Sequence, residues 1–342
     1  MELRFTEREE AFRREIREFL NQELPPGWMG FEEGDEYEGE GWEFTRSMAQ
    51  KLAQKGWLTL AWPRDYGGQA RPVMEQVIYM EEMAYHMVPS ACLDMGVGGV
   101  GWVGPTLMIY GDEEQKREHI SPIGAGQRFW CTGYSEPGAG SDLASLQTQA
   151  VSDGDDYVVN GQKTWTSGGH ISDWCWLAAR TDPDAPKHKG ISLLLVDMKS
   201  PGLTVRPIVN MAGGHEFNET FFENVRVPKR NRVGEENRGW YYVAVALDFE
   251  RSHIRDAAIQ RRKLEELVAF VRNEKPAAIA SRASQASMRH RLAEASIAIE
   301  VCRWLAYRVA WMQGQGIVPN MEASVCKLFA TETRQRLAGI AM

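Results

Sequence analysis

Residues 146–168 read LQTQAVSDGDDYVVNGQKTWTSG, and this stretch decides the fold that we expect for the middle of the chain. It favours β-strands, and the turn pairs Asp153-Gly154 and Asn160-Gly161 punctuate it at short intervals. Further strand-like runs lie on both sides, from FWCTGYS at 129–135 to TFFENVRVP at 220–228. These runs predict an antiparallel sheet domain, a small β-barrel or sandwich.

Helical patterns flank the sheet on both sides. Thr6 and Glu9 form a capping box at the start of the first helix, and residues 73–87 carry an apolar stripe. A long amphipathic stretch begins at Gly239 and breaks near Pro276, and a second long helix follows it. The chain is therefore expected to be α+β with three domains: an N-terminal helical domain at 1–127, the sheet domain at 128–237 and an incomplete C-terminal helical bundle at 238–342.

Composition excludes several classes of protein. The 342 residues carry a net charge of −8, which disfavours a general nucleic-acid binder because such a protein needs a basic face. No apolar run approaches the length of a membrane span, and the N-terminus has no signal-peptide core.

The five cysteines are scattered without a C-x-x-C pair, which argues against disulfides and zinc and favours the cytoplasm. The seven histidines show no metal-ligand spacing, so no metal is expected.

A glycine-rich loop, YSEPGAGSDLAS at residues 134–145, follows an expected strand. It matches neither the P-loop nor the dinucleotide G-x-G-x-x-G motif. Amides freed from regular pairing by Gly138 and Gly140 could face an anion such as a phosphate, with the hydroxyls of Ser135 and Ser141 as further donors. The alternative is a hairpin loop that serves only the chain reversal.

Trp165 lies between two hydroxyl residues in NGQKTWTSGG at residues 160–169. Its indole could pack against a planar heterocycle while Thr166 or Ser167 forms a hydrogen bond with the polar edge of that ring. The alternative is a core tryptophan, since the chain has 12 and most of them must be simple packing.

Glu250 is an acid on an apolar helical stripe that includes Leu247 and Ile254. Burying an ionised carboxylate is costly unless the charge is compensated. Desolvation raises the pKa of a carboxylate toward neutrality, which suits a general base that removes a weakly acidic C–H proton. The alternative is a structural ion pair with Arg251, Arg255 or a neighbouring helix.

Taken together, these features resemble the acyl-CoA dehydrogenases, a family of FAD-dependent flavoproteins. The resemblance spans the chain and rests on the helix–sheet–helix order and on six segments: GWLTLAWPRDYGG (56–68), YGDEEQK (110–116), YSEPGAGSDLAS (134–145), NGQKTWTSGG (160–169), FFENVRVPKRNRVGEENRGW (221–240) and LDFERS (247–252). The family's Arg-x-x-Phe-Gly motif and its last helices are not found, so we expect the C-terminal bundle to lack them.

The resemblance implies a site whose residues can be named. FAD would be held by Thr132, Tyr134 and Ser135 along the flavin ring, Gly140 and Ser141 near the pyrophosphate, and Trp165 and Ser167 beside the isoalloxazine. The acyl-CoA substrate would be held by Ser141, Leu247, Asp248 and Arg251.

The implied reaction oxidises a saturated acyl-CoA to the trans-2-enoyl-CoA, within fatty acid or lipid metabolism. A base takes the α-proton while a hydride leaves the β-carbon for flavin N5. The isovaleryl- and long-chain branches place this base directly before the arginine of the long helix, where Glu250 stands. The resemblance also implies an electron-transfer flavoprotein as acceptor and a tetramer of like or unlike chains.

Two other functions stay open. One is a non-catalytic or half-site subunit of a heteromeric acyl-CoA dehydrogenase, which the absent Arg-x-x-Phe-Gly motif favours. The other is a flavin monooxygenase or oxidase on the same fold, although oxygen activation has no need of a base at Glu250.

Overall fold

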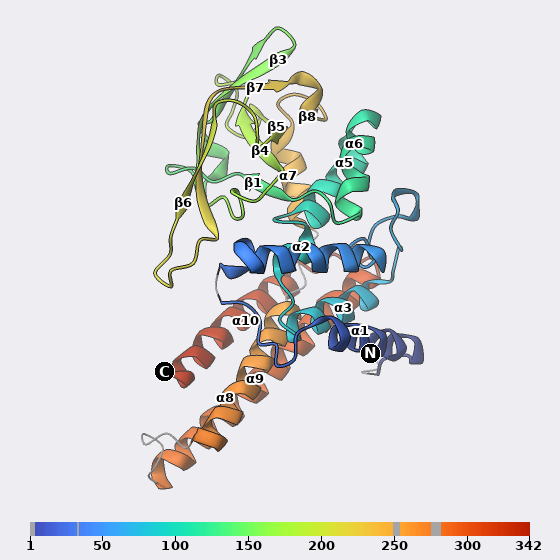
Figure 1. Cartoon of the computed structure of the whole chain (residues 1–342), viewed down its shortest axis with the longest axis vertical. Helices are drawn as coiled ribbons and strands as arrows, with labels where there is room; N and C mark the ends of the chain where they lie inside the picture. Colours follow the sequence, from blue (N-terminus) through green and yellow to red (C-terminus); the bar gives the residue numbers. More distant parts are fainter. Residues whose placement is uncertain (1–3, 33, 249–253, 275–281) are drawn as a thin grey trace. The chain divides into compact units, whose positions relative to one another are not determined.

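The computed structural model describes residues 4–32, 34–248, 254–274 and 282–342. The chain divides into two compact units, each assembled from segments that are distant in the sequence. The first, called here the helical unit, comprises Met1–Gly30, Arg71–Val88 and Arg251–Met342. The second, called the sheet unit, comprises Phe31–Ala70 and Pro89–Glu250. The expected order of helices, sheet and helices is confirmed (Figure 1).

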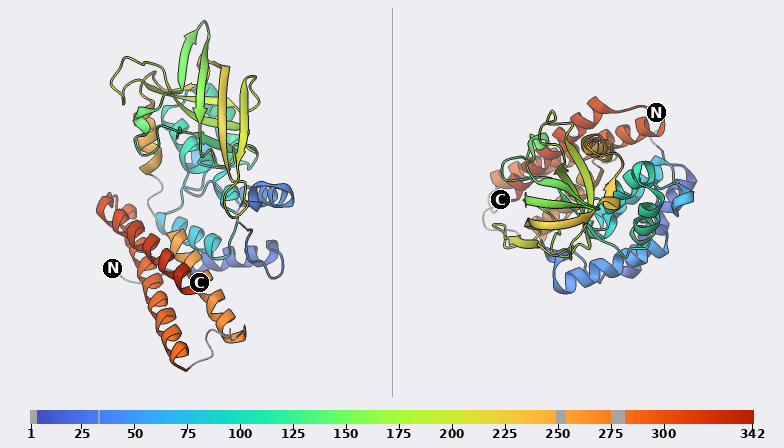
Figure 2. Two further views of the ribbon diagram at one scale, coloured as in Figure 1. Left: turned by 90° about the vertical axis from the view of Figure 1, so that its left-hand side faces the viewer. Right: turned by 90° about the horizontal axis from the view of Figure 1, so that it is seen from above.

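The helical unit contains α1 (Glu7–Glu23), α3 (Val73–Tyr85), α8 (Ile254–Glu274), α9 (Arg282–Gly314) and α10 (Asn320–Ala341). The expected capping box begins α1: Thr6 Oγ1 accepts the Glu9 amide at 3.3 Å, and the Glu9 carboxylate accepts the Thr6 amide at 2.7 Å. Helix α9 packs along both α8 and α10 (Figure 2). Small residues such as Ala306 and Ala310 on the buried face of α9 allow this close approach.

The described residues of the sheet unit form five α-helices and a sheet. Its helices are α2 (Gly39–Gln54), α4 (Ser90–Asp94), α5 (Gly104–Tyr110), α6 (Glu113–Gly124) and α7 (Gly239–Asp248). The long helix expected after Gly239 is described as α7 and α8, and residues 249–253 between them lie outside the described part of the chain. Within the described residues, no helix is long and apolar enough to cross a lipid bilayer.

In the part of the chain that the structure describes, eight strands form one open sheet. They are β1 (Trp130–Gly133), β2 (Gln149–Asp153), β3 (Asp156–Lys163), β4 (Trp174–Arg180), β5 (Ile191–Asp197), β6 (Leu203–Ile208), β7 (Phe217–Pro228) and β8 (Arg232–Val233). The order is β6-β7-β3-β2-β4-β5-β8, with β1 on β4. Most neighbours are antiparallel as expected, but β1 and β2 each pair with β4 in parallel. The apolar pattern of β4 could not reveal this, because all but the first of its residues are buried and either direction of pairing would suit it.

A buried ion pair joins the end of β3 to the glycine-rich loop. The Lys163 side chain is fully buried, and its Nζ donates to Glu136 Oε1 at 2.8 Å and to the Tyr134 carbonyl at 3.0 Å. The Glu136 carboxylate also accepts the amides of Gln147 and Thr148, at 2.6 and 2.8 Å. One carboxylate therefore fixes both ends of the loop, and the loop cannot move without breaking buried polar contacts.

Opposing effects act on the charges of this pair. Burial by itself would raise the pKa of Glu136, but Lys163 and the surrounding hydrogen bonds outweigh it and hold this pKa below its usual value. Burial lowers the pKa of Lys163, and the facing carboxylate opposes that shift. The Lys163 shift alone would favour a neutral pair. Because three donors converge on Glu136, we conclude that the pair is ionised in neutral solution.

Replacing Lys163 by methionine is expected to destabilise the sheet unit by about 3–5 kcal/mol, because Glu136 is then buried without its counter-charge. Urea unfolding at pH 7, followed by tryptophan fluorescence, measures this loss. Lys187→Met is the matched control, since Lys187 pairs with Asp142 in the same loop but both side chains are about half exposed. The control should cost less than about 1 kcal/mol.

The destabilisation by Lys163→Met should also depend on pH. A carboxylate with a lowered pKa stabilises the fold above its unfolded value, about 4.3, and this contribution is lost as the pH falls through the folded value. The difference between wild type and Lys163→Met should therefore shrink in acid. Equal costs for Lys163→Met and Lys187→Met at pH 7 would contradict the assigned role of the buried pair.

Candidate functional site

The loop at residues 134–145 and the turn at Trp165 meet at the end of β3. Directly after Lys163, the Thr164 amide donates to the Ser135 carbonyl at 2.9 Å. Tyr134 and Ser135 therefore lie beside the chain that leads into Trp165. Thr132 stands two residues earlier on β1, where it is paired with Trp176 of β4. The structure thus brings together all five residues expected along the flavin ring: Thr132, Tyr134, Ser135, Trp165 and Ser167.

The outer part of the loop exposes its backbone. Glu136 and Ala139 close a tight turn by exchanging two hydrogen bonds of 3.0 and 3.1 Å. The amides of Gly140 and Ser141, which follow, donate to no group of the described residues. Both residues are exposed. A side chain built at Gly138 or Gly140 would meet no atom of the described residues within 4 Å. A large ligand can therefore approach the peptide groups here directly, as an anionic group that binds to amides requires.

Trp165 presents its ring to solvent from a constrained backbone. The residue is 59% exposed and has a φ of 60°, a left-handed conformation that is unfavourable for a bulky side chain. Among the aromatic rings of the described residues, Phe217 contacts the Trp165 ring in a T-shaped arrangement, with the ring centroids 5.9 Å apart. The alternative of a core tryptophan therefore does not hold for Trp165. An exposed indole on a constrained turn offers a flat surface for stacking.

Thr166 anchors this turn to β7. Its amide donates to the Asn218 carbonyl at 2.9 Å, and its carbonyl accepts the Asn218 side-chain amide at 3.0 Å. The Thr166 hydroxyl is buried and has no hydrogen-bond partner among the described residues. Such an unsatisfied buried group is uncommon in a folded protein, and it lies inside the turn and not on its ligand-accessible side.

These features fit a flavin dinucleotide. The Trp165 indole can cover a planar ring, the hydroxyl of the half-buried Ser167 can reach its polar edge, and the open amides of Gly140 and Ser141 suit a pyrophosphate. The buried Lys163–Glu136 pair holds the two segments together.

The residues expected to act on the acyl-CoA are described less fully. Glu250 and Arg251 lie outside the described residues. Leu247 and Asp248 end helix α7, and only their backbone is described. Of the expected substrate-binding residues, Ser141 alone has a described side chain, and it is exposed on the loop. The roles of Glu250, Leu247, Asp248 and Arg251 therefore stay predictions.

Sequence reasoning missed three residues that shape the site: Glu136, Lys163 and Asn218. Glu136 and Lys163 both lie within motifs that had been singled out, yet they are 27 positions apart and nothing in the pattern shows that they meet. A lysine in a strand next to a glycine-rich motif was the one available signal. Asn218 gave none, because asparagines are common near strand ends.

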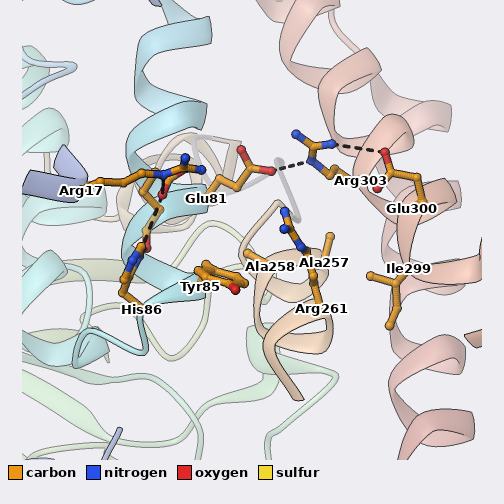
Figure 3. A pocket seen from close by; sticks show the side chains of 11 residues that line it. Arg17, Glu81, Tyr85, His86, Ala257, Ala258, Arg261, Ile299, Glu300 and Arg303 are labelled. Atoms are coloured by element: carbon orange, nitrogen blue, oxygen red, sulfur yellow. Dashed lines mark hydrogen bonds and ion pairs between the residues drawn. The ribbon is translucent and has the colours of Figure 1, made fainter. Parts of the chain in front are cut away.

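The helical unit holds a charged cavity of about 250 Å³ (Figure 3). Its charged lining is already paired: Arg17 with Glu82, Arg303 with Glu81 and Glu300, and Arg261 with Glu265. Burial would raise the pKa of Glu81, but the guanidinium groups of Arg13 and Arg303 outweigh it and lower that pKa. Because each of these charges is compensated by a neighbour, we interpret the cluster as a structural network that connects α1, α3 and α9.

Known proteins match nearly the whole chain. The acyl-CoA dehydrogenase N-terminal, middle and C-terminal domain families match residues 6–127, 131–225 and 237–342. The acyl-CoA dehydrogenase FadE26 of Mycobacterium tuberculosis is 39% identical over 342 residues, which cover 97% of this chain and 83% of FadE26.

Two solved structures share the fold. The Tcur3481-Tcur3483 steroid ACAD is 35% identical with a TM-score of 0.83, and the match covers 99% of this chain and 86% of that chain. The ChsE4-ChsE5 complex from Mycobacterium tuberculosis is 37% identical with a TM-score of 0.84, at the same coverage. The sequence matches and the fold agree: this chain belongs to the acyl-CoA dehydrogenase family of FAD-binding oxidoreductases.

Proposed function

We propose that this chain converts an acyl-CoA thioester into the trans-2-enoyl-CoA, with Glu250 as the base. The observation that carries the proposal is the exposed Trp165 ring on a pinned turn that is hydrogen-bonded, through Thr164 and Ser135, to the loop with the open amides of Gly140 and Ser141. In a member of this family, that arrangement is the place for the flavin. Glu250 follows α7 in the sequence, three residues after Leu247 on an apolar stripe.

In the proposed reaction, Glu250 takes the proton from the α-carbon and the electron pair of that C–H bond becomes the new C=C bond. A bound FAD would supply the acceptor for the hydride that leaves the β-carbon. The Gly140 and Ser141 amides would hold its anionic pyrophosphate, and the Trp165 indole would cover its planar ring and exclude water there. An electron-transfer flavoprotein is the acceptor that we propose, and the five free, buried cysteines accord with a cytoplasmic enzyme of lipid metabolism.

Glu250→Gln is expected to keep FAD and to lose the reaction. A glutamine has the size of the glutamate but cannot take a proton, so reduction of the flavin by an acyl-CoA should slow by about 10²–10⁴-fold. Anaerobic stopped-flow measurement of the loss of flavin absorbance gives this rate.

The control is Glu223→Gln, which removes an equal charge from an exposed position on β7. It should reduce at the wild-type rate. An unchanged rate in Glu250→Gln would remove Glu250 from the mechanism.

A second candidate function is a half-site role in an assembly of unlike chains. The Tcur3481-Tcur3483 and ChsE4-ChsE5 structures, both named as pairs of chains, favour it. On this reading the protein alone would be colourless and would acquire flavin only with its partner chain. The first of these structures is named as a steroid ACAD. We therefore propose to compare two substrates first: a CoA thioester with a bulky polycyclic acyl group and one with a straight acyl chain.

An apolar face supports assembly in either case. Helices α9 and α10 and the turn between them expose large apolar side chains: Ile297, Val301, Trp311, Ile317, Val318, Met321, Val325 and Leu328. A face of this kind commonly marks a contact with another chain. We propose that it joins the subunits of a tetramer.

Leu328→Glu tests this contact, because a charge buried in an apolar interface is costly. The mass measured by light scattering after gel filtration should fall to that of a smaller assembly. Gln22→Glu on the exposed side of α1 adds the same charge elsewhere in the helical unit and should leave the mass unchanged. A Leu328→Glu protein of unchanged mass would exclude this face as the contact.

A further inference from the structure

An exposed basic turn beside the glycine-rich loop has no part in the reaction described above. It comprises Lys187, His188 and Lys189, which precede β5, and all three side chains are exposed. Lys187 Nζ lies 2.9 and 2.8 Å from the two carboxylate oxygens of Asp142. The turn is therefore in contact with the residue that follows Ser141 in the loop.

Arg180 fixes the position of this turn. Arg180 is buried, and its Nη1 donates to the Lys187 carbonyl at 3.0 Å while its Nη2 donates to the Ala144 carbonyl at 2.7 Å. Its Nη2 and Nε also lie 3.3 and 3.4 Å from the Leu146 carbonyl. One buried side chain thus joins the basic turn to the end of the glycine-rich loop, and breaking these buried bonds would be costly.

The start of α7 lies beside the turn. The backbone of Arg238 pairs with Ile191, two residues after the turn. The Trp240 ring contacts the His188 ring in a T-shaped arrangement, with the centroids 4.8 Å apart. The Arg238 guanidinium lies over the Tyr241 ring, 4.7 Å from its centroid. We call the surface that these segments share the basic patch, and it consists of Lys187, His188, Lys189, Arg238 and Trp240.

Two cations of the basic patch are open to a ligand. Among the described residues, Lys189 and Arg238 have no carboxylate partner, and both are exposed. Asp182, which precedes the turn, directs its Oδ1 to two backbone amides at 3.0 and 3.1 Å. Asp184 and Glu235 are exposed acids close by in the sequence, so the patch has no strong positive field overall. An anion must therefore be recognised here by direct contact with the two cations.

The basic patch lies at the start of the helix whose end leads to the proposed base. Helix α7 runs from Gly239 to Asp248, so it spans about 15 Å. Glu250 stands two residues after its end in the sequence. A CoA thioester has a similar layout, because its reacting carbons lie beside the thioester and its 3′-phosphorylated ADP lies at the other end of the pantetheine arm. The patch thus lies where the phosphate-rich end of such a substrate is to be expected.

We propose that the basic patch is the subsite for the 3′-phosphorylated ADP of a CoA thioester and that it selects CoA thioesters over thioesters without a nucleotide. Lys189 and Arg238 contact the phosphate groups, and the half-buried Trp240 ring packs against the adenine. This inference rests on the proposed function, because it requires a CoA thioester as the substrate.

FAD also carries an adenine nucleotide, but it is the less suitable occupant. Its pyrophosphate has a place at the open amides of Gly140 and Ser141, and it has no 3′-phosphate to occupy further cations. A substrate must also enter and leave at each turnover, which suits the exposed position of Lys189 and Arg238.

Anaerobic reduction of the flavin in the purified holoenzyme tests the proposal with two matched substrates: an acyl-CoA and the acyl-pantetheine thioester with the same acyl group. At low ionic strength the acyl-CoA should be half-saturating at a concentration about tenfold lower, as expected for two exposed charge contacts. In Lys189→Gln/Arg238→Gln, the half-saturating concentration of the acyl-CoA should rise to that of the acyl-pantetheine. Added salt should reduce the wild-type preference in the same direction, because exposed charges are screened.

Lys199→Gln/Arg206→Gln is the matched control. Both residues are exposed in the sheet unit, and Arg206 lies 4.7 Å over an aromatic ring, as Arg238 lies over Tyr241. Arg206 belongs to β6, at the other edge of the sheet from β5 and β8. The control removes the same charge and should keep the tenfold preference. A Lys189→Gln/Arg238→Gln protein with the wild-type preference would overturn the proposal.

Calorimetric titration with CoA and with 3′-dephospho-CoA measures the same contact without turnover. The wild-type holoenzyme should bind CoA several-fold more tightly than 3′-dephospho-CoA, and Lys189→Gln/Arg238→Gln should bind both equally. Equal affinities in the wild type would contradict a contact with the 3′-phosphate.

The outcomes also separate failure of this inference from failure of the proposed function. If neither a straight-chain nor a polycyclic acyl-CoA reduces the wild-type flavin, the proposed function fails and the inference fails with it. If an acyl-CoA and its acyl-pantetheine reduce the flavin with equal half-saturating concentrations, dehydrogenation stands and the basic patch is not its nucleotide subsite. If Lys189→Gln/Arg238→Gln loses FAD but keeps the preference for acyl-CoA, the patch binds the adenylate of the cofactor and the inference is wrong.

Discussion

The ion pair between Lys163 and Glu136 fixes the shape of the region that we assign to the cofactor. Neither charge could remain in the interior of the sheet unit without the other, because an isolated buried charge is costly. Glu136 also holds two amides at the far end of the loop, and Lys163 is followed at once by the turn that carries Trp165. The pair therefore sets the spacing between the loop amides and the indole before any ligand arrives. Such preorganisation lowers the entropic cost of binding a long cofactor.

The candidate site combines a rigid backbone framework with a solvent-exposed surface. The backbone of Thr166 is pinned to β7 through Asn218, and the Ser135 carbonyl is bonded to Thr164. By contrast, Trp165, Gly140 and Ser141 face solvent and carry little packing of their own. Exposed apolar and amide groups on a rigid frame are poor at stabilising the fold but well placed to bind a ligand. The left-handed Trp165 backbone belongs to the same pattern, because strain persists where the surrounding contacts fix it.

Local signals allowed the order of elements to be predicted. The Thr6–Glu9 capping box and the Asp153-Gly154 turn each depend on residues that are close in the sequence, and both are present in the structure. The parallel pairing of β1 with β4 could not be predicted, since it depends on the path of the chain between them. For the site, the two motifs that hold Trp165 and Gly140 could be singled out, but the buried pair beneath them could not. Lys163 and Glu136 meet only after β3 and β1 are in place, and a single sequence carries no record of that distance.

The most direct measurement of this account is a crystal structure of the protein with FAD bound. The account predicts the isoalloxazine against the Trp165 ring and near Tyr134 and Ser135, the pyrophosphate at the amides of Gly140 and Ser141, and an intact Lys163–Glu136 pair beneath them. A flavin that lies away from Trp165, or a Glu136 carboxylate turned out to solvent with the loop rearranged, would contradict it.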